Sequence, residues 1–155
     1  MTSGAWMAQA IEMAVDNARS GRGGPFAALV VKEGAVIASG VNMVAASNDP
    51  TAHAEIVAIR EACRALGTFQ LTGCDIYATC EPCPMCLGAI YWARAARVFC
   101  AATNQDAAAA GFDDSYIYGE LAAPPAARRI PTIYLMREQA GRAFEAWRKA
   151  PHTSY

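Results

Sequence analysis

The sequence lacks the long hydrophobic run that a membrane-spanning helix requires. No segment of its 155 residues approaches about eighteen uninterrupted apolar positions. Residues 1–9 also lack the basic stretch followed by an apolar segment that marks a secretory signal peptide. We therefore expect a soluble, cytoplasmic protein with no membrane partner.

A general excess of basic residues is absent as well. The net charge is −1, and residues 1–123 contain seven Lys and Arg against twelve Asp and Glu. Only residues 124–155 are basic, with six Lys and Arg against two Asp and Glu, and a solvated helix face explains a patch of that size. Because nucleic-acid-binding domains are usually basic overall, this distribution argues against nucleic acid as the partner.

The chain is short for two domains of ordinary size, and it contains no internal repeat. With 155 residues, of which 54% are hydrophobic, it can bury one core. Pro124 and Pro125 interrupt the pattern, but the residues after them are too few for a second core. We therefore expect one domain over residues 1–155.

Apolar periodicity predicts helices and strands that alternate along the chain. Helical spacing is found at 5–18, 52–66, 84–94 and 138–149, and a further helix is expected from Ser115. Thr51 is the expected N-cap of the second helix. Strand-like runs are found at 26–31, 35–41, 75–79 and 97–101, and the first two read as a hairpin. Residues 132–136 form another short apolar run. This order predicts a mixed α/β layer fold.

Six cysteines are present, and their clustering is more informative than their number. In a reducing compartment cysteines more often bind metals or lie buried than form disulfides. Cys83 and Cys86 stand at the start of a predicted helix, where the helix N-terminus favours thiolates. Together with His53 they would bind one zinc ion and leave a fourth position open for water. We therefore predict a zinc site formed by His53, Cys83 and Cys86.

Glu55 stands two residues after His53, and Pro82 precedes Cys83. The combined pattern, His-x-Glu followed by Pro-Cys-x-x-Cys, is typical of zinc-dependent nucleobase deaminases. Zinc lowers the pKa of a bound water towards about 7, and a nearby carboxylate can move the proton to the substrate. Both His53 and Glu55 can reach the metal only if the start of their helix meets it end-on. On that geometry we predict Glu55 as the proton shuttle.

Cys80 supports a competing interpretation, because Cys80, Cys83 and Cys86 form two overlapping Cys-x-x-Cys pairs. With His53, three cysteines would close the zinc site and produce a structural module without chemistry. An iron–sulfur cluster would need a fourth nearby cysteine, and the next one is Cys100. Cys80, however, is expected at the end of a strand before Pro82, so its side chain need not face the other two. The open site is therefore our main prediction.

These motifs resemble the cytidine-deaminase-fold superfamily, and within it the bacterial guanine deaminases. The likeness covers almost the whole chain, with matching stretches at residues 23–26, 47–55, 80–94 and 111–115. It implies a three-layer α/β/α fold with a central mixed sheet of about five strands and one zinc ion per subunit. It also implies a homodimer in which residues 138–155 or so swap onto the partner subunit. A tail that is simply frayed is the alternative.

The resemblance further implies hydrolysis of guanine to xanthine and ammonia. Zinc-bound hydroxide would attack C2, Glu55 would shuttle the proton, and Asp114 would help the amine to leave. The resemblance implies substrate contacts for Phe26, Asn42 and Tyr155, and Ala54 and Trp92 are further predicted contacts. Chemistry permits these roles, since guanine presents donors that a carboxylate such as Asp114 can accept and an amide can serve either donors or acceptors.

Several of these residues could instead have purely structural roles. Asp114 could belong to a turn or helix cap, whereas Phe26 and Trp92 could be packing residues. The zinc motif alone also fits a tRNA adenosine deaminase, and guanosine, triazines and isocytosine-like pyrimidines are alternative substrates. The residues at 87–92 and in the C-terminal tail differ from the pattern expected of the tRNA enzymes. Guanine is therefore the predicted substrate.

Overall fold

The chain divides in sequence between Asp114 and Ser115 into two units, and the computed structural model describes residues 2–154. The helices of the first unit are α1 (Ser3–Arg19), α2 (Val44–Ser47), α3 (Ala54–Leu66), α4 (Pro84–Trp92) and α5 (Asn104–Ala109). Its strands are β1 (Ala27–Lys32), β2 (Ala35–Val41), β3 (Cys74–Cys80) and β4 (Arg97–Ala102). The four predicted strands and the first three predicted helices are therefore present, with ends that shift by one or two residues.

The strands form one mixed sheet with the order β2-β1-β3-β4. Strand β1 pairs antiparallel with both β2 and β3, whereas β3 and β4 are parallel. This sheet has four strands in the described chain, not the expected number of about five. The apolar run at 132–136 forms no strand, because an extended segment becomes a strand only when a neighbour pairs with it.

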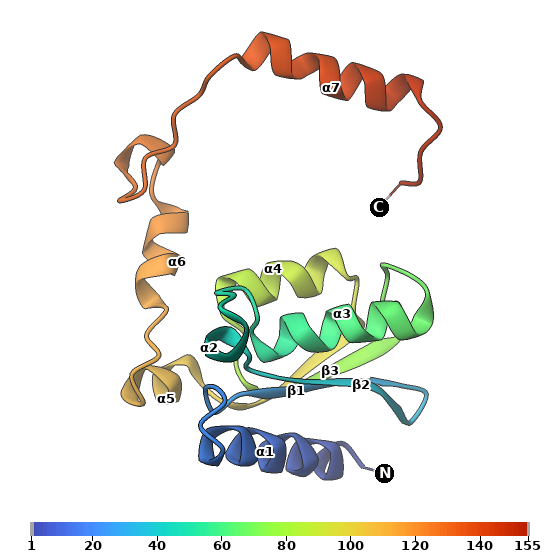
Figure 1. Ribbon diagram of the computed structural model, residues 1–155, viewed down its shortest axis with the longest axis vertical. Coiled ribbons are helices and arrows are strands. Elements are labelled where there is room, and N and C mark those ends of the chain that lie inside the picture. The colour runs from blue at the N-terminus through green and yellow to red at the C-terminus, as the bar shows by residue number, and fades with distance from the viewer. Residues whose placement is uncertain (1, 155) are drawn as a thin grey trace. The chain divides into compact units, whose positions relative to one another are not determined.

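The sheet is covered by helices on both faces, with α1 on one side and α3 and α4 on the other (Figure 1). Alternate side chains of β1 serve the two layers. Val30 packs in the cluster beneath α3, whereas Leu29 packs with Trp6 of α1 and Tyr77 of β3. Full burial of a side chain such as Leu29 stabilises the fold by roughly 1.5–3 kcal/mol. The predicted three-layer α/β/α architecture is confirmed.

Helix α3 begins at Ala54, two residues later than predicted, and His53 is its N-cap. The prediction that Thr51 caps this helix is wrong. Asp49 explains the difference, because its carboxylate accepts hydrogen bonds from the backbone N–H and the hydroxyl of Thr51, at 2.8 and 2.7 Å. This local turn uses the groups of Thr51 that would otherwise start or cap the helix. His53 therefore has extended backbone angles, φ −68° and ψ 156°.

Gly40 sets how closely the start of α3 approaches the sheet. A Cβ at this position of β2 would lie 2.3 Å from the carbonyl oxygen of Ala54 and 2.6 Å from the backbone nitrogen of Ala58. Only a residue without a side chain fits such a contact. The first turns of α3, which follow His53 and include Glu55, thus rest directly on the backbone of β2.

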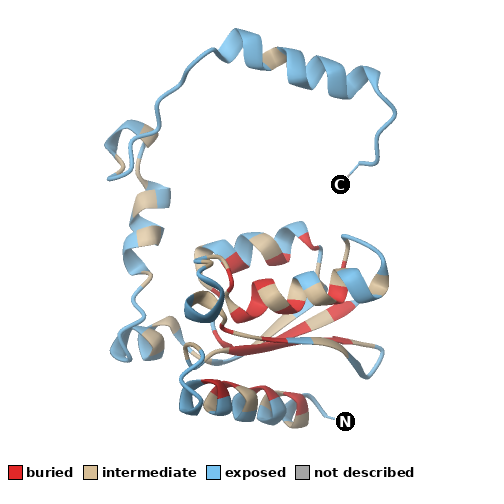
Figure 2. Ribbon diagram, viewed as in Figure 1, coloured by how far each residue is buried: buried red, intermediate tan, exposed pale blue. Residues whose placement is uncertain are grey.

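The second unit contains α6 (Ser115–Ala122), the short 3₁₀ helix η1 (Pro125–Ala127) and α7 (Arg137–Lys149). The predicted helices from Ser115 and at 138–149 are therefore present. None of the described residues from Ser115 onwards is buried, as Figure 2 shows by the lack of red in this part of the chain. Among the described helices of the whole chain, none is long and apolar enough to cross a membrane.

Candidate active site

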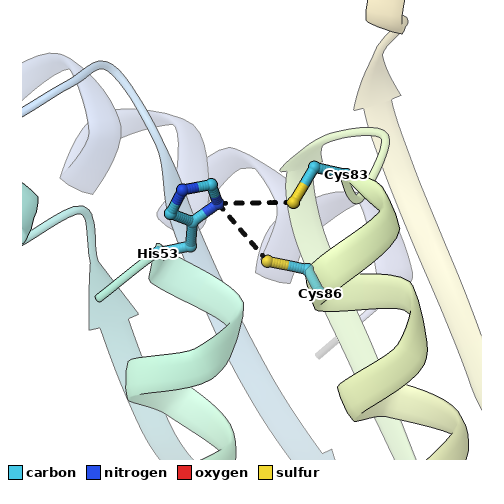
Figure 3. A group of neighbouring side chains, drawn as sticks. All are labelled: His53, Cys83 and Cys86. Atoms are coloured by element: carbon cyan, nitrogen blue, oxygen red, sulfur yellow. Dashed lines mark hydrogen bonds between the residues drawn. The ribbon is translucent and has the colours of Figure 1, made fainter. Parts of the chain in front are cut away.

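The N-termini of two helices bring the three predicted metal ligands together (Figure 3). His53 is the N-cap of α3, and Cys83 is the N-cap of α4, with φ −64° and ψ 168°. Pro84 occupies the first turn of α4, where a missing N–H costs nothing. Cys86 is in the same turn and is buried. Because His53 stands before its helix, it need not share a helix face with Glu55, which removes the geometric conflict in the sequence pattern.

The ligand atoms have the spacing that a tetrahedral zinc ion requires. Nδ1 of His53 lies 3.5 Å from Sγ of Cys83 and 3.5 Å from Sγ of Cys86. With Zn–S of about 2.3 Å and Zn–N of about 2.05 Å, a tetrahedral angle separates nitrogen and sulfur by about 3.6 Å. The ligand atoms of all three residues lie within 4.8 Å of one another. One histidine and two cysteines therefore fit a single zinc ion with one position left for another ligand.

Cys80 does not belong to this cluster among the described residues. It is the last residue of β3, and its thiol donates to the carbonyl oxygen of Thr103 at 3.4 Å. Burial raises the pKa of this thiol to about 11, so it stays protonated near neutral pH. The geometry thus favours an open site with three ligands over a closed Cys₃His site.

The electrostatics of the cluster favour metal binding through Cys83. A hydrogen bond from the Cys86 thiol lowers the pKa of Cys83 to about 4, and the contact with His53 acts in the same direction. The same Cys83 thiolate raises the pKa of His53 through a hydrogen bond. The pKa of Cys86 is raised instead, because its thiol proton is held by Cys83 and its side chain is buried. A dication would displace the shared protons, since thiolates and neutral imidazole are the forms that bind zinc.

Glu55 lies next to the metal ligands at the start of α3. It is buried, and its carboxyl group interacts with the thiol of Cys86. Burial raises the pKa of the Glu55 carboxyl, and the charge of Cys83 contributes in the same direction. A carboxyl group with a raised pKa beside a metal site can both accept and return a proton near neutral pH.

The ligand cluster opens into a cavity of about 260 Å³. This volume is close to the lower end of the range for small-molecule sites, about 300–1,000 Å³. Six of the predicted site residues line the cavity: Phe26, Asn42, His53, Glu55, Cys83 and Asp114. They come from segments that are far apart in the sequence, and the fold brings them together.

The remaining predicted substrate contacts are placed differently. Ala54 is buried as the first residue of α3 and is not among the cavity-lining residues. Trp92 is the last residue of α4, with 68% of its surface exposed, and it does not line the cavity either. Tyr155 lies outside the described residues. The predicted roles of these three residues stay predictions.

Several cavity residues were missed by the sequence argument. Phe112 packs edge-on against Phe26, with ring centroids 4.9 Å apart and an interplanar angle of 86°. Thr79 at the end of β3 accepts a hydrogen bond from the backbone N–H of Ala27 at 3.1 Å and also lines the cavity, as do Glu81 and Asn104. The stretch at 111–115 that carries the family resemblance contains Phe112, and it could have suggested this residue.

Asp114 is the last residue of the first unit, and it lines the cavity near Cys83. Desolvation raises the pKa of its carboxyl group, and the negative charge of Cys83 adds to the effect. The site therefore combines a metal cluster, a buried carboxyl group and a second carboxyl group around one cavity. This combination can activate water and move protons to and from a small molecule.

Comparison with known families identifies the site. Residues 2–102 match the family described as the cytidine and deoxycytidylate deaminase zinc-binding region. The chain belongs to this deaminase family. Its three-ligand cluster is thus the zinc site of a zinc-binding deaminase domain.

Guanine deaminase of Bacillus subtilis (strain 168) is 53% identical over 143 residues, which cover 92% of each chain. The X-ray structure of guanine deaminase from Bacillus subtilis matches with a TM-score of 0.97 and 50% identity, over 100% of this chain and 99% of that one. A structure of guanine deaminase from Nitrosomonas europaea matches with a TM-score of 0.70 and 36% identity, over 73% of this chain and 65% of that one.

A tRNA-specific adenosine deaminase of Aquifex aeolicus (strain VF5) is also similar, at 47% identity over 81 residues. This match covers 52% of the chain and 54% of that enzyme. The likeness to the Bacillus enzyme named above therefore extends over far more of the chain than the likeness to this tRNA enzyme.

Proposed function

We propose that this protein hydrolyses guanine to xanthine and ammonia. The observation that carries the proposal is an open three-ligand metal cluster beside a buried carboxyl group, in a cavity of about 260 Å³ that suits a single base. Support for guanine comes from the relative that matches over 92% of the chain, because that relative is a guanine deaminase. The reaction consumes one water, which supplies the oxygen at C2, and releases the 2-amino group as ammonia.

The zinc ion held by His53, Cys83 and Cys86 supplies, when bound, an open coordination position and lowers the pKa of a water there towards about 7. Glu55 takes the proton that the attacking water loses and delivers it to the ring nitrogen next to C2. The raised pKa of Glu55 suits this exchange, because burial disfavours the charged carboxylate and so favours uptake of the proton. A second proton transfer then lets the amine leave. Asp114 assists this departure from its position in the same cavity.

The proposed substrate contacts divide into a wall and a set of polar groups. Phe26 and Phe112 form an aromatic wall on which a purine ring can stack. Asn42 and Asp114 provide the polar contacts that orient the base. Ala54, Trp92 and Tyr155 complete the proposal as further contacts, with Tyr155 closing the site.

The decisive experiment is an ammonia-release panel on the zinc-loaded protein. The substrates are guanine, guanosine, adenine, cytosine, ammeline, isocytosine and a tRNA stem-loop. We expect guanine to give the highest kcat/KM, because the polar groups of the cavity suit a purine that carries both donors and acceptors. Preferential release of ammonia from the stem-loop, with activity that falls steeply as salt increases, would instead assign the protein to tRNA editing.

The role of Glu55 has its own test. Glu55→Ala is expected to abolish turnover of guanine while the protein keeps one zinc ion, because the carboxylate moves protons and is not a metal ligand. Zinc content and steady-state rates are measured on the same preparation. Turnover that persists in this variant would remove Glu55 from the mechanism.

We further propose a cytoplasmic homodimer in which residues 138–155 or so swap onto the partner subunit. The free cysteines Cys63, Cys74, Cys80, Cys83, Cys86 and Cys100 suit a reducing compartment. Support for the swap comes from the second unit, whose described residues include no buried one. Analytical ultracentrifugation over a range of concentrations tests the dimer, and a monomer at all concentrations would contradict it.

A further inference from the structure

Asn17 is a buried polar residue of α1 for which the proposed mechanism has no role. Only 1% of its surface is exposed. Its amide nitrogen Nδ2 donates one hydrogen bond to the carbonyl oxygen of Gly24, at 2.9 Å, and a second to that of Asn42, at 3.0 Å. One side chain thus ties helix α1 to the loop before β1 and to the residue that follows β2.

The orientation of the Asn17 amide is determined by these partners. Both partners are carbonyl oxygens, so only the NH₂ group can face them. The amide oxygen Oδ1 is then buried with no hydrogen-bond partner in the described part of the chain. A buried acceptor without a partner costs free energy. An apolar side chain would avoid this cost, but it would leave the two carbonyl groups without their donor.

The Asn42 side chain is oriented in turn by the backbone around it. Its Oδ1 accepts hydrogen bonds from the N–H groups of Gly24, at 3.4 Å, and Val44, at 3.3 Å. Since Oδ1 faces these two donors, Nδ2 is the part of the amide left for a ligand. Asn42 lines the cavity. It therefore offers a hydrogen-bond donor there, and a matching ligand must present an acceptor.

Gly23 holds the same carbonyl group of Asn42 from another direction. A Cβ built on Gly23 would lie 2.1 Å from the Asn42 carbonyl oxygen and 3.0 Å from Nδ2 of Asn17. No side chain fits there, so the backbone at Gly23 packs directly against Asn42. The carbonyl group of Asn42 is thus fixed by a hydrogen bond on one side and by backbone contact on the other.

We propose that Asn17 is a positioning residue that locks the Asn42 amide with Nδ2 towards the cavity and so selects bases with an acceptor at that point. The identity of the base rests on the proposed function, and guanine presents acceptors at its carbonyl oxygen and its ring nitrogens. Asn17 acts on the substrate through Asn42, directly at the Asn42 backbone carbonyl and also through Gly24, whose N–H group donates to the Asn42 Oδ1. Its loss should therefore weaken substrate binding equally in the ground state and the transition state, which raises KM and leaves kcat nearly unchanged.

A double-mutant cycle on the zinc-loaded, full-length protein tests this role. We expect Asn17→Ala to raise KM for guanine about 10-fold and to change kcat less than about twofold, with unchanged zinc content. Asn42→Ala should raise KM at least as much. The double variant should be no worse than Asn42→Ala alone, because Asn17 then has no amide to position. Multiplicative effects of the two changes, or an unchanged KM in Asn17→Ala, would overturn the proposal.

A control separates positioning from a general loss of stability. Met13→Ala shortens another side chain of α1, one that packs against the cluster containing Trp6, Leu29 and Tyr77. It should lower Tm without raising KM, and an equal rise in KM would overturn the proposal. If Asn17→Ala does not fold, Asn17→Asp keeps the shape of the side chain, but its carboxyl group can donate at most one hydrogen bond. The same cycle with Asn42→Ala then applies.

The outcome for Asn17 is distinguishable from the outcome for the proposed function. Wild-type protein that releases no ammonia from guanine contradicts the function, whatever the variants do. Active wild-type protein whose two substitutions act independently contradicts only the role of Asn17.

Discussion

The two units of the chain place their apolar side chains in opposite ways. In the first unit these side chains form clusters on both faces of the sheet. In the second unit, Ile130, Ile133 and Leu135 are exposed over 83%, 76% and 79% of their surfaces. The first unit therefore has a core, whereas the described residues of the second unit have none.

This difference separates the described groups of the candidate site from the stretch of exposed apolar residues along the sequence. The metal ligands, Glu55 and all the described residues that line the cavity belong to the first unit. Exposed apolar residues in a contiguous stretch are typical of surfaces that another chain or domain covers. We therefore expect substitutions in the first unit to change chemistry and folding, and substitutions in the second to change association first.

The largest effect is expected from loss of a metal ligand. Cys86→Ser should lose zinc and reduce kcat/KM by more than about 100-fold, because even residues that only support a ligand cost about 10–100-fold when changed. Cys80→Ser is the matched control and should keep the zinc, since Cys80 lies outside the ligand cluster. Metal analysis and kinetics decide the result. Equal zinc loss in both variants would instead support the closed, structural zinc site.

The next effect concerns the contact between α3 and the sheet. Gly40→Ala should lower the free energy of unfolding by about 1–3 kcal/mol, because the new Cβ overlaps the backbone of Ala54 and Ala58. It should also weaken zinc binding, since α3 follows directly on His53. Gly88→Ala is the control: it has open space around it in helix α4, and we expect stability to stay equal or rise. Urea denaturation measures the stability of both variants. Equal destabilisation by the two substitutions would contradict the close approach of α3 to Gly40.

Much of the first unit could be predicted because its signals are local. The spacing of Cys83 and Cys86, together with His53, predicted a set of metal ligands. The structure confirms that these three side chains converge. Strand and helix positions followed from periodicity in the same way. The N-cap of α3 was predicted wrongly because the side chain of Asp49 competes for Thr51, and this competition depends on turn geometry that hydrophobic spacing does not encode.

Features that depend on distant contacts could not be predicted from local patterns. The place of Phe112 beside Phe26 requires the path of the chain after β4. The described sheet has four strands rather than the five or so that the family resemblance implied, and the short apolar run at 132–136 does not pair with it. Sequence pattern thus identified the chemical groups of the site more reliably than the walls around them.

A smaller effect is expected in the second unit. Phe144 of α7 is 66% exposed, and replacement of an exposed side chain usually changes stability by less than about 0.5 kcal/mol. If α7 docks on a partner subunit, Phe144→Glu should instead raise the dimer dissociation constant by about 10-fold, or about 1.4 kcal/mol. Gln139→Glu adds the same charge to an exposed polar position of α7 and should have no such effect. Sedimentation velocity distinguishes a docked helix from a frayed one.

The smallest expected effect lies at α5, the last helix of the first unit. Asp106 and Thr103 form a capping box there, in which the Asp106 carboxylate accepts from the backbone N–H and the hydroxyl of Thr103, each at 2.8 Å. These bonds, the backbone one first, lower the pKa of Asp106 below its ordinary value of 3.8. A carboxyl group with a lowered pKa stabilises the fold above its ordinary pKa and loses this contribution as the pH falls.

Asp106→Ala should therefore lower Tm slightly at pH 7, and its difference from wild type should shrink as the pH falls below about 4. Gln105→Ala is a suitable control, because Gln105 is an exposed neighbour in the same helix and its side chain does not titrate. Its difference from wild type should not vary with pH, even though zinc release at low pH lowers both melting temperatures. A difference for Asp106→Ala that grows on acidification would mean that the carboxyl group is bound more tightly in its protonated form. The end of the first unit would then be stabilised by something other than this cap.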